Sequence, residues 1–294
     1  MQPHVMTLIA APATAPELAG VAGRVADAVA AAVDWLAPGE ACDIVTTADP
    51  AAAEAAARAA IGAAPIDLVV QPLAGRRKRI LVADLESTII ENEMLEELAE
   101  FVGLRAHVAE ITRRAMNGEI DFVGALSERV ALLRGLPVDV LEQASERVRL
   151  MPGAIELLAT MQADGARCAL VSGGFSVFAV GVGVALGFER IVANRLDIAD
   201  GRLAGTVRTP IVTAATKRAT LLAFAEDSGV GAEAAVAVGD GANDLPMLMA
   251  AGLGIAFRAK PAVAAAARWH IDHADLTALL YAQGYRREDF VEFV

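Results

Sequence analysis

The sequence predicts an α/β protein in which a small N-terminal α/β module precedes a core with a parallel sheet and a helical insertion. Short apolar runs rich in β-branched residues alternate with stretches of helical periodicity along most of the chain. One stretch, about residues 91–150, is helical almost throughout. Strands alternating with helices are typical of a parallel sheet covered on both faces. A chain of 294 residues, 55% of them hydrophobic, is long enough to build two domains.

Residues 1–76 are predicted to form the small module. The segments "HVMTLIAA", "CDIVTTA" and "IDLVVQPL" predict strands, and "LAGVAGRVADAVAAAVDWL" and "AAAEAAARAAIGAA" predict helices, which together make a βαβαβ unit. No cluster of reactive residues occurs there, so the module is interpreted either as ligand-sensing or as packing surface. The basic run "RRKR" at 76–79 is interpreted as a solvated linker, and residues 77–294 as the second domain.

The core begins with the strand "RILVAD" and is interrupted by the helical insertion. A helix in "MPGAIELLATMQADG" then precedes the strands "ARCALVSGGF", "AAVAVGD" and "LGIAF". Three strands end in polar residues, namely Asp84, Ser172 and Asp240. Because ligands of parallel sheets bind beyond the carboxyl ends of the strands, we expect these three side chains to converge at one edge.

Composition excludes several classes of function. A formal net charge of −12 argues against a nucleic-acid partner, since phosphate binding needs a surplus of Lys and Arg. No apolar stretch reaches the ~20 residues of a membrane span, and the first residues lack a secretory signal, so a cytoplasmic location is expected. Cys42 and Cys168 are interpreted as reduced thiols, and the H-x-x-H of His270 and His273 as a solvated helix end. The oligomeric state stays open, a homodimer included.

The strand-end residues suggest phosphoryl-transfer chemistry when they are taken together. Asp84 alone could be a helix cap or a turn residue. Beside Asp240, however, its carboxylate can ligate Mg²⁺, and it can also serve as a nucleophile toward phosphorus. Ser172 and the backbone N–H of Gly173 make a plausible phosphate cradle, and Lys217 adds a compact positive charge. The competing interpretation is a glycine-rich turn without chemistry.

Four segments carry a resemblance to a known family. The motifs "DLEST", "SGGF", Lys217 in "ATKRAT" and "GDGANDLPML" resemble those of the haloacid dehalogenase (HAD) superfamily of phosphotransferases, and most closely its phosphoserine phosphatases. The resemblance covers about residues 78–294 and implies a Rossmann-like core, with "RAMNGEIDFVGALSERVALLRG" as part of a helical cap. The first 75 residues are only loosely similar to the ACT-like regulatory modules of some bacterial members.

The resemblance implies a Mg²⁺-dependent enzyme that hydrolyses O-phospho-L-serine to L-serine and phosphate through an aspartyl-phosphate, the last step of serine biosynthesis. It assigns Glu93 to the substrate ammonium, Arg129 to its carboxylate and Phe122 to the wall of the site. An acid suits an amine and a bidentate guanidinium suits a carboxylate. Taken singly, Glu93 or Arg129 on an amphipathic helix is more often a solvated charge.

The resemblance also implies roles around the phosphate and the metal. Asn243 is expected to donate to the phosphate, and Asp244 to orient a water on the metal or Lys217. The metal ligands are expected to be Asp84, Asp240 and the main-chain carbonyl of Glu86. The Glu86 side chain is expected to be the general acid and then the base, since two residues beyond Asp84 on an extended segment it returns to the same face.

Glu86 is also the departure from the family pattern, which ordinarily has Asp there. Two alternatives to phosphoserine hydrolysis therefore stay open. One is a phosphatase or phosphotransferase acting on another small amino-alcohol phosphate. The other is a regulatory protein that binds phosphoserine and turns it over weakly.

Overall fold

The computed structural model describes residues 2–11, 14–117 and 119–291. The described residues form two compact units, each built from separated parts of the chain. The first unit contains Met1–Arg79, Pro152–Ala166 and Arg268–Val294, and the second contains Ile80–Met151 and Arg167–Ala267. None of the described helices has the length and apolar character that crossing a membrane requires.

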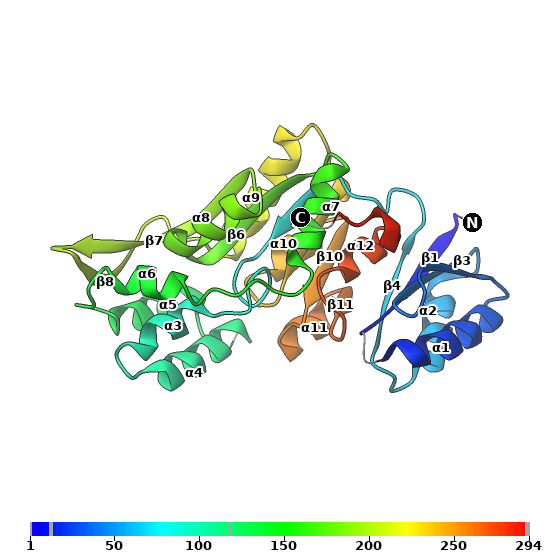
Figure 1. The fold of residues 1–294 in the computed structure, drawn as a ribbon, viewed down its shortest axis with the longest axis horizontal. Helices are drawn as coiled ribbons and strands as arrows, with labels where there is room; N and C mark the ends of the chain where they lie inside the picture. Colours follow the sequence, from blue (N-terminus) through cyan, green and yellow to red (C-terminus); the bar gives the residue numbers. More distant parts are fainter. Residues whose placement is uncertain (1, 12–13, 118, 292–294) are drawn as a thin grey trace. The chain divides into compact units, whose positions relative to one another are not determined.

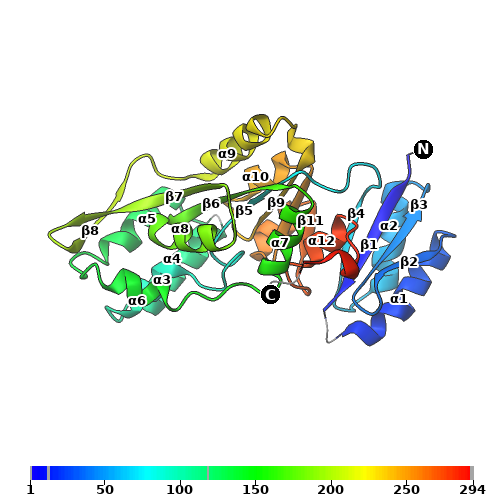
Figure 2. The same cartoon turned by 45° about the horizontal axis from the view of Figure 1, so that its top comes forward.

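The N-terminal module of the first unit is an antiparallel sheet with two helices on one face (Figures 1 and 2). Its elements in chain order are β1 (His4–Ala10), α1 (Ala15–Ala28), β2 (Val33–Ala37), β3 (Ala41–Thr46), α2 (Pro50–Ile61) and β4 (Ile66–Pro72). The strand order is β2-β3-β1-β4. Side chains such as Leu8, Ile44 and Leu68 project from the sheet into a core shared with α1 and α2.

The predicted βαβαβ unit is wrong in one element, because a strand was taken for the end of a helix. Residues 33–37 form β2, which pairs antiparallel with β3 and places Val33 opposite Ile44 and Trp35 opposite Cys42. β-Branched and aromatic residues pack well on a pleated surface, and a turn through Gly39, with φ of 82°, lets residues 33–37 pair with the neighbouring strand. The module is therefore βαββαβ.

The other face of this sheet carries buried polar side chains that bind the C-terminal segment of the same unit. Asp67 accepts hydrogen bonds from the backbone N–H groups of Asp272 and Ala274, at 2.8 and 2.9 Å. Gln71 donates to the carbonyl of Ala282 at 2.7 Å. The remaining elements of the unit are α7 (Ala154–Ala163), β11 (Trp269–Ile271), α12 (Ala278–Ala282) and a 3₁₀ turn at Arg287–Asp289. The predicted domain boundary between residues 76 and 77 stays a prediction.

The interpretation of "RRKR" as a solvated linker is wrong for two of its residues. Arg76 pairs with the buried Asp43 at 2.6 Å, and its side chain is only 16% exposed. Lys78 is buried and donates to the carbonyl of Gly75. Burying a carboxylate such as Asp43 requires a partner charge, and a long arginine side chain can supply one while its stem packs against apolar surface.

The second unit is built on a sheet whose strands are mostly parallel, as predicted. Its strands are β5 (Ile80–Ala83), β6 (Arg167–Phe175), β7 (Arg190–Ala199), β8 (Arg202–Arg208), β9 (Ala235–Gly239) and β10 (Leu253–Phe257). Within the unit they lie in the order β10-β9-β5-β6-β7-β8, and only β8 is antiparallel to its neighbour. The sequence did not reveal the β7–β8 hairpin.

Helices cover both faces of this sheet. The flanking elements are α8 (Ser176–Ala185), α9 (Ala214–Asp227), a 3₁₀ turn at Ala232–Ala234, α10 (Leu245–Ala250) and α11 (Pro261–Ala266). Leu221 and Phe224 of α9 pack with Ile80, Val82 and Val171 on one face. On the opposite face Gly183 of α8 lets the helix approach closely, because a Cβ there would lie 2.5 Å from Ile191.

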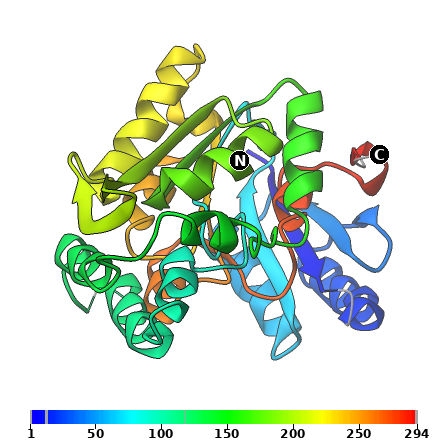
Figure 3. The same cartoon turned by 60° about the vertical axis from the view of Figure 1, so that its left-hand side comes forward.

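The predicted helical insertion is confirmed as four helices that join the core through two adjacent linkers (Figure 3). They are α3 (Met94–Glu100), α4 (Arg105–Met116), α5 (Phe122–Ala131) and α6 (Val140–Ser145). The linkers run antiparallel, with Ile90 bridged to Leu150 and the N–H of Met151 donating to the carbonyl of Ile89. The insertion, called the cap below, is thus connected to the core by these paired linkers, and its segment 135–138 also hydrogen-bonds to the β7–β8 hairpin, with the N–H of Gly135 donating to the carbonyl of Leu203 at 2.9 Å.

Candidate active site

Adjacent parallel strands bring the predicted strand-end residues to one edge of the sheet. β5 lies between β9 and β6, so Asp84 follows the central strand, Asp240 follows β9, and Ser172 lies within β6, which continues to Phe175. The N–H of Asp84 still bonds to the carbonyl of Val238 at 3.0 Å, which fixes the start of the loop beyond the strand. Parallel pairing of distant segments therefore produces the convergence that the sequence predicts.

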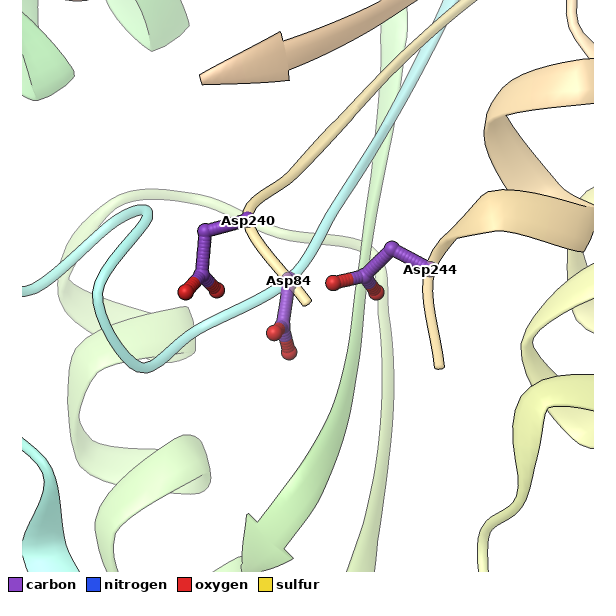
Figure 4. A group of neighbouring side chains, drawn as sticks. All are labelled: Asp84, Asp240 and Asp244. Atoms are coloured by element: carbon purple, nitrogen blue, oxygen red, sulfur yellow. The ribbon is translucent and has the colours of Figure 1, made fainter. Parts of the chain in front are cut away.

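Three carboxylates form an acidic centre at this edge. Asp84, Asp240 and Asp244 each offer an oxygen within 4.8 Å of the others, and all three residues are buried. Figure 4 shows their carboxylates turned toward a common space, with Asp84 between the other two. Lys217 lies among them, with its Nζ 2.7 Å from Asp84 Oδ1 and 2.6 Å from Asp244 Oδ1. One ammonium thus holds two of the three carboxylates.

Burial and crowding of like charges perturb the acids of this centre. Burial, followed by the charge of Asp244, raises the pKa of Asp84 to about 8 in the metal-free protein, although Lys217 opposes the rise. Burial likewise raises the pKa of Asp240 to about 7, with Lys260 opposing. Charged carboxylates in such a site favour a further cation, because the two ammonium groups of Lys217 and Lys260 do not balance three acids. Perturbed acids in a pocket are typical of functional sites.

The donor set of the acidic centre fits a small, hard divalent cation. Carboxylate oxygens are the ligands that Mg²⁺ prefers, and Asn243 Oδ1 lies beside them, buried without a hydrogen-bond partner among the described residues. The side chain of Glu86 does not belong to this group of carboxylates. The proposal that its main-chain carbonyl is a ligand stays a prediction.

Metal-free protein is expected to lose stability as the pH rises from about 4 to about 8. Asp84 and Asp240 have higher pKa values in the folded protein than in the unfolded protein. At a pH between the two values the unfolded state has released protons that the folded state still binds, so raising the pH favours unfolding. Thermal unfolding in chelator at pH 6 and pH 8 measures this loss. Asp84→Asn, which cannot titrate at that position, should show a smaller loss. An equal pH dependence in both proteins would contradict the assignment.

Glu86 reaches the same site through a tight loop. The strand ends at Ala83, and the N–H groups of Ile89 and Ile90 both bond to the carbonyl of Leu85. Ser87 adopts a left-handed φ of 53°, which turns the chain there. The regular strand therefore ends before Glu86 and the chain turns directly after it, while Glu86 and Asp84 line one pocket.

The cap holds the Glu86 carboxylate. Its Oε1 accepts a hydrogen bond of 3.0 Å from the N–H of Met94, the first residue of α3. This N–H has no partner within the helix, so Glu86 satisfies it as a capping side chain would. Burial and then the charges of Glu93 and Asp84 raise the pKa of Glu86 well above its usual value. A raised pKa favours the protonated carboxyl group, which is the form that a general acid uses.

Gly174 provides the space that the longer Glu86 side chain occupies. A Cβ at residue 174 would lie 2.8 Å from both carboxylate oxygens of Glu86. Gly173 is similarly close to Phe122, whose Cζ would lie 2.9 Å from a Cβ. Because neither glycine has a Cβ, Gly174 leaves room for Glu86 of the core and Gly173 leaves room for Phe122 of the cap.

Gly174→Ala is expected to displace the Glu86 carboxyl group and so to lower kcat of a reaction that uses this group by about 10²-fold, because a displacement of about 1 Å at a catalytic group has that effect. Glu86→Asp in the same chain removes a methylene and should restore part of the activity. Gly181→Ala is the matched control, since a Cβ there meets nothing within 4 Å. Steady-state kinetics of the three variants measure whether the effect of Gly174→Ala comes from its contact with Glu86. A fully active Gly174→Ala enzyme, or no recovery in the double variant, would contradict the steric link.

Cap residues close the pocket over the acidic centre. Asp121 caps α5 by accepting a 2.6 Å hydrogen bond from the N–H of Gly124, which sets Phe122 at the start of the helix. Two turns further along the same helix, Arg129 is buried and donates to Thr112 Oγ1 at 2.7 Å. Glu93 accepts a 2.7 Å hydrogen bond from the hydroxyl of Ser87.

Most of the predicted site residues line one pocket of the second unit. They are Asp84, Glu86, Glu93, Phe122, Arg129, Gly173, Asp240 and Asn243. Lys217 and Asp244 are held behind Asp84, and the Oγ of Ser172 accepts a 2.9 Å hydrogen bond from the N–H of Gly174. The pocket volume is about 20 Å³, which is room for about one water. A larger molecule can enter only when the cap moves.

Sequence reasoning missed two polar residues of this region. Lys260 lies just beyond β10, with its Nζ 3.2 Å from Asp240 Oδ2. The rule that strand ends carry function could have found it. Asn194 of β7 donates to the carbonyl of Gly173 at 2.7 Å and accepts from the N–H of Val212 at 2.8 Å. Nothing in its local sequence signals this contact.

A parallel core with an acidic centre at its carboxyl edge and a helical cap over that edge defines the class of capped α/β hydrolases. The chain belongs to the haloacid dehalogenase-like hydrolase family, whose sequence model matches residues 81–249.

Similar proteins carry consistent names. The chain is 44% identical over 224 residues to phosphoserine phosphatase SerB2 of Mycobacterium tuberculosis, covering 76% of this chain and 55% of that protein. It is 42% identical over 203 residues to a phosphoserine phosphatase of Lactococcus lactis, covering 69% of this chain and 94% of that protein. A crystal structure of a HAD-family hydrolase from Salmonella enterica serovar Typhi superposes with a TM-score of 0.83 at 26% identity, covering 97% and 99%.

Matched segments do not always span the relatives. Those of the Mycobacterium protein and of phosphoserine phosphatases from Archaeoglobus fulgidus and Streptomyces coelicolor cover 55%, 63% and 59% of their lengths. The chain thus corresponds to less than two thirds of these three proteins.

Proposed function

We propose that the protein is a Mg²⁺-dependent phosphoserine phosphatase, acting at the last step of serine biosynthesis. The observation that carries the proposal is the pocket in which Asp84 and Glu86 of the core meet Glu93 and Arg129 of the cap. The first pair supplies a nucleophile and a proton donor. The second pair offers an anion and a cation, which match the ammonium and carboxylate of phosphoserine. The names of the relatives support the same substrate.

The proposed reaction has two steps that use the residues of this chain. An oxygen of Asp84 attacks phosphorus, the bond from phosphorus to the serine oxygen breaks, and Glu86 gives its proton to that oxygen. Water then attacks the aspartyl-phosphate while the Glu86 carboxylate takes its proton, which releases phosphate and restores Asp84. Lys217 and the N–H of Gly173 balance charge on the phosphoryl oxygens.

Asp84 and Asp240, with Asp244 nearby, would hold Mg²⁺ in this proposal. The cation would favour the ionised nucleophile and neutralise negative charge on the phosphate. Burial raises the pKa of Glu86, which favours the protonated form that a general acid uses. The closed cap would keep bulk water from the aspartyl-phosphate and leave room for about one molecule, the water that attacks it with Glu86 as base.

Phosphate release from O-phospho-L-serine, measured with Mg²⁺ and then with chelator, tests the proposal. Free serine in equal amount is the expected second product. A phosphorylated second product would favour a phosphotransferase. Saturable phosphoserine binding with no release would favour the regulatory protein that binds without turnover.

Arg129→Ala is expected to raise KM for phosphoserine about 10²-fold and to leave KM for a phosphomonoester without a carboxylate within about threefold. The loss corresponds to a charge-assisted hydrogen bond of about 1.5–3 kcal/mol. Steady-state kinetics on both substrates make the comparison. The matched control is Arg113→Ala, an exposed cap arginine that pairs with Glu110. An equal effect on the two substrates would contradict the carboxylate assignment.

A further inference from the structure

A second cavity of the second unit, about 700 Å³ in volume, shares no lining residue with the pocket of the acidic centre. It lies between cap helix α6, the beginning of α8 and the β7–β8 hairpin, and we call it the hairpin cavity. Its charged lining residues are Asp139, Glu142, Arg195 and Arg208. Cavities of 300–1,000 Å³ are typical of small-molecule sites. The proposed phosphatase reaction uses none of these residues.

Two arginines face each other on one wall of the hairpin cavity. Arg195 of β7 is directly opposite Arg208 of β8 in the antiparallel register. Side chains so placed share a face with Cβ atoms about 5 Å apart, and like charges there repel. The Arg195 side chain has no ion pair or hydrogen bond among the described residues, and the Arg208 side chain meets Asp197 only through Nε at 3.4 Å. An oxyanion between the guanidinium groups would relieve this repulsion.

The cap side of the cavity carries the opposite charge. Asp139 precedes α6 and Glu142 lies in its first turn, and neither side chain has an ion pair among the described residues. The same cavity is also lined by apolar side chains, of which Val177 and Ile198 are 43% and 51% exposed. The cavity therefore offers cations, anions and uncovered apolar surface in one place.

We propose that the hairpin cavity binds a free α-amino acid with an apolar side chain. The carboxylate lies against Arg195 and Arg208, the ammonium against Asp139 and Glu142, and the side chain covers Val177 and Ile198. A polyanion is disfavoured by the two acids, and a purely apolar ligand would desolvate four charges without pairing them. Serine would leave the apolar wall uncovered.

The hairpin cavity adjoins the loop that lines the active pocket. Gly173 and Gly174 face that pocket, while the next residues, Phe175 to Val177, line the hairpin cavity. Arg195 follows Asn194, which holds the carbonyl of Gly173 at 2.7 Å. A ligand on Arg195 therefore contacts the strand that positions the Gly173 carbonyl. We expect the amide NMR signal of Gly173 to shift when the cavity is filled.

Titration of the full chain with L-leucine, free of Mg²⁺ and of phosphate esters, tests the site by NMR independently of any phosphatase activity. Saturable binding is expected below about 10 mM, and Arg195→Ala and Glu142→Gln should each weaken it about tenfold or more. L-leucinamide and N-acetyl-L-leucine each lack one charge and should bind about tenfold more weakly. Arg218→Ala, an exposed arginine of α9 outside the cavity, should bind normally.

Several outcomes would overturn the proposal. They are absence of saturation, equal affinity for leucine and leucinamide, and binding that survives Arg195→Ala. Binding lost in Arg129→Ala instead would place the ligand in the active pocket. Leucine binding that leaves the Gly173 amide unshifted would overturn the link to the loop.

Discussion

Asp84→Asn is expected to abolish phosphate release from phosphoserine, with kcat reduced at least about 10³-fold, the scale on which loss of a nucleophile acts. Asparagine keeps the shape of the side chain and removes the oxygen nucleophile. The fold should survive, because Lys217 keeps Asp244 as a partner at 2.6 Å. The substitution also removes one of three crowded carboxylates.

Acid quenching after mixing with radiolabelled phosphoserine separates a chemical role from a structural one. When the label is in the phosphate group, wild-type protein should retain it as the aspartyl-phosphate, and the folded Asp84→Asn variant should retain none. Asp227→Asn is the matched control, since Asp227 is a 55% exposed partner of Arg190 outside the pocket. Residual activity above about a tenth of wild type would remove Asp84 from the nucleophile role.

Glu86→Gln is expected to lower kcat by about 10²- to 10⁴-fold while the affinity for Mg²⁺ changes less than about threefold. The glutamine carbonyl oxygen can still accept the hydrogen bond from Met94 N–H, so the variant isolates the loss of the proton. The Glu86 side chain lies outside the group of three carboxylates, so metal affinity should persist. Kinetics combined with calorimetric titration of Mg²⁺ measure both quantities.

Glu86→Asp is the informative partner of that variant. Asp and Glu have similar intrinsic pKa values, about 3.9 and 4.3, so the shorter side chain changes reach more than proton affinity. Activity should persist in Glu86→Asp, since the proton donor remains. A fully active Glu86→Gln enzyme would refute the acid and base role. If the wild-type protein were nearly inert and Glu86→Asp made it a fast phosphatase, the result would favour the regulatory protein that binds phosphoserine and turns it over weakly.

Local sequence patterns were sufficient for the parts of the fold that depend on short-range physics. Helical periodicity predicted the helical cap over about residues 91–150, because each helix buries one stripe of its surface. Apolar runs predicted β5, β6, β9 and β10, because strands buried on both faces are apolar throughout. The strand-end rule then predicted that Asp84 and Asp240 would meet. Their chemical roles stay predictions until the variants are measured.

Other features depended on segments far apart in the chain. The β7–β8 hairpin joins the core sheet through pairing of β7 with β6, and Asn194 of β7 holds the carbonyl of Gly173, a contact that local sequence does not signal. Residues 268–294 joined the unit of the N-terminal module through contacts such as that of Asp67 with Ala274, which no local pattern records.

By itself, the sequence determined the α/β class, the helical cap and the acidic residues at the strand ends, since these follow from periodicity and residue type. Only the tertiary structure decided how the Glu86 side chain fits into the pocket, because the space for it depends on the missing side chain of Gly174, which lies 88 residues further along the chain. It also decided that Lys260 approaches Asp240 and that Arg195 faces Arg208. The physical reason is that close packing and charge pairing depend on distances in space, and chain folding sets these between residues remote in sequence.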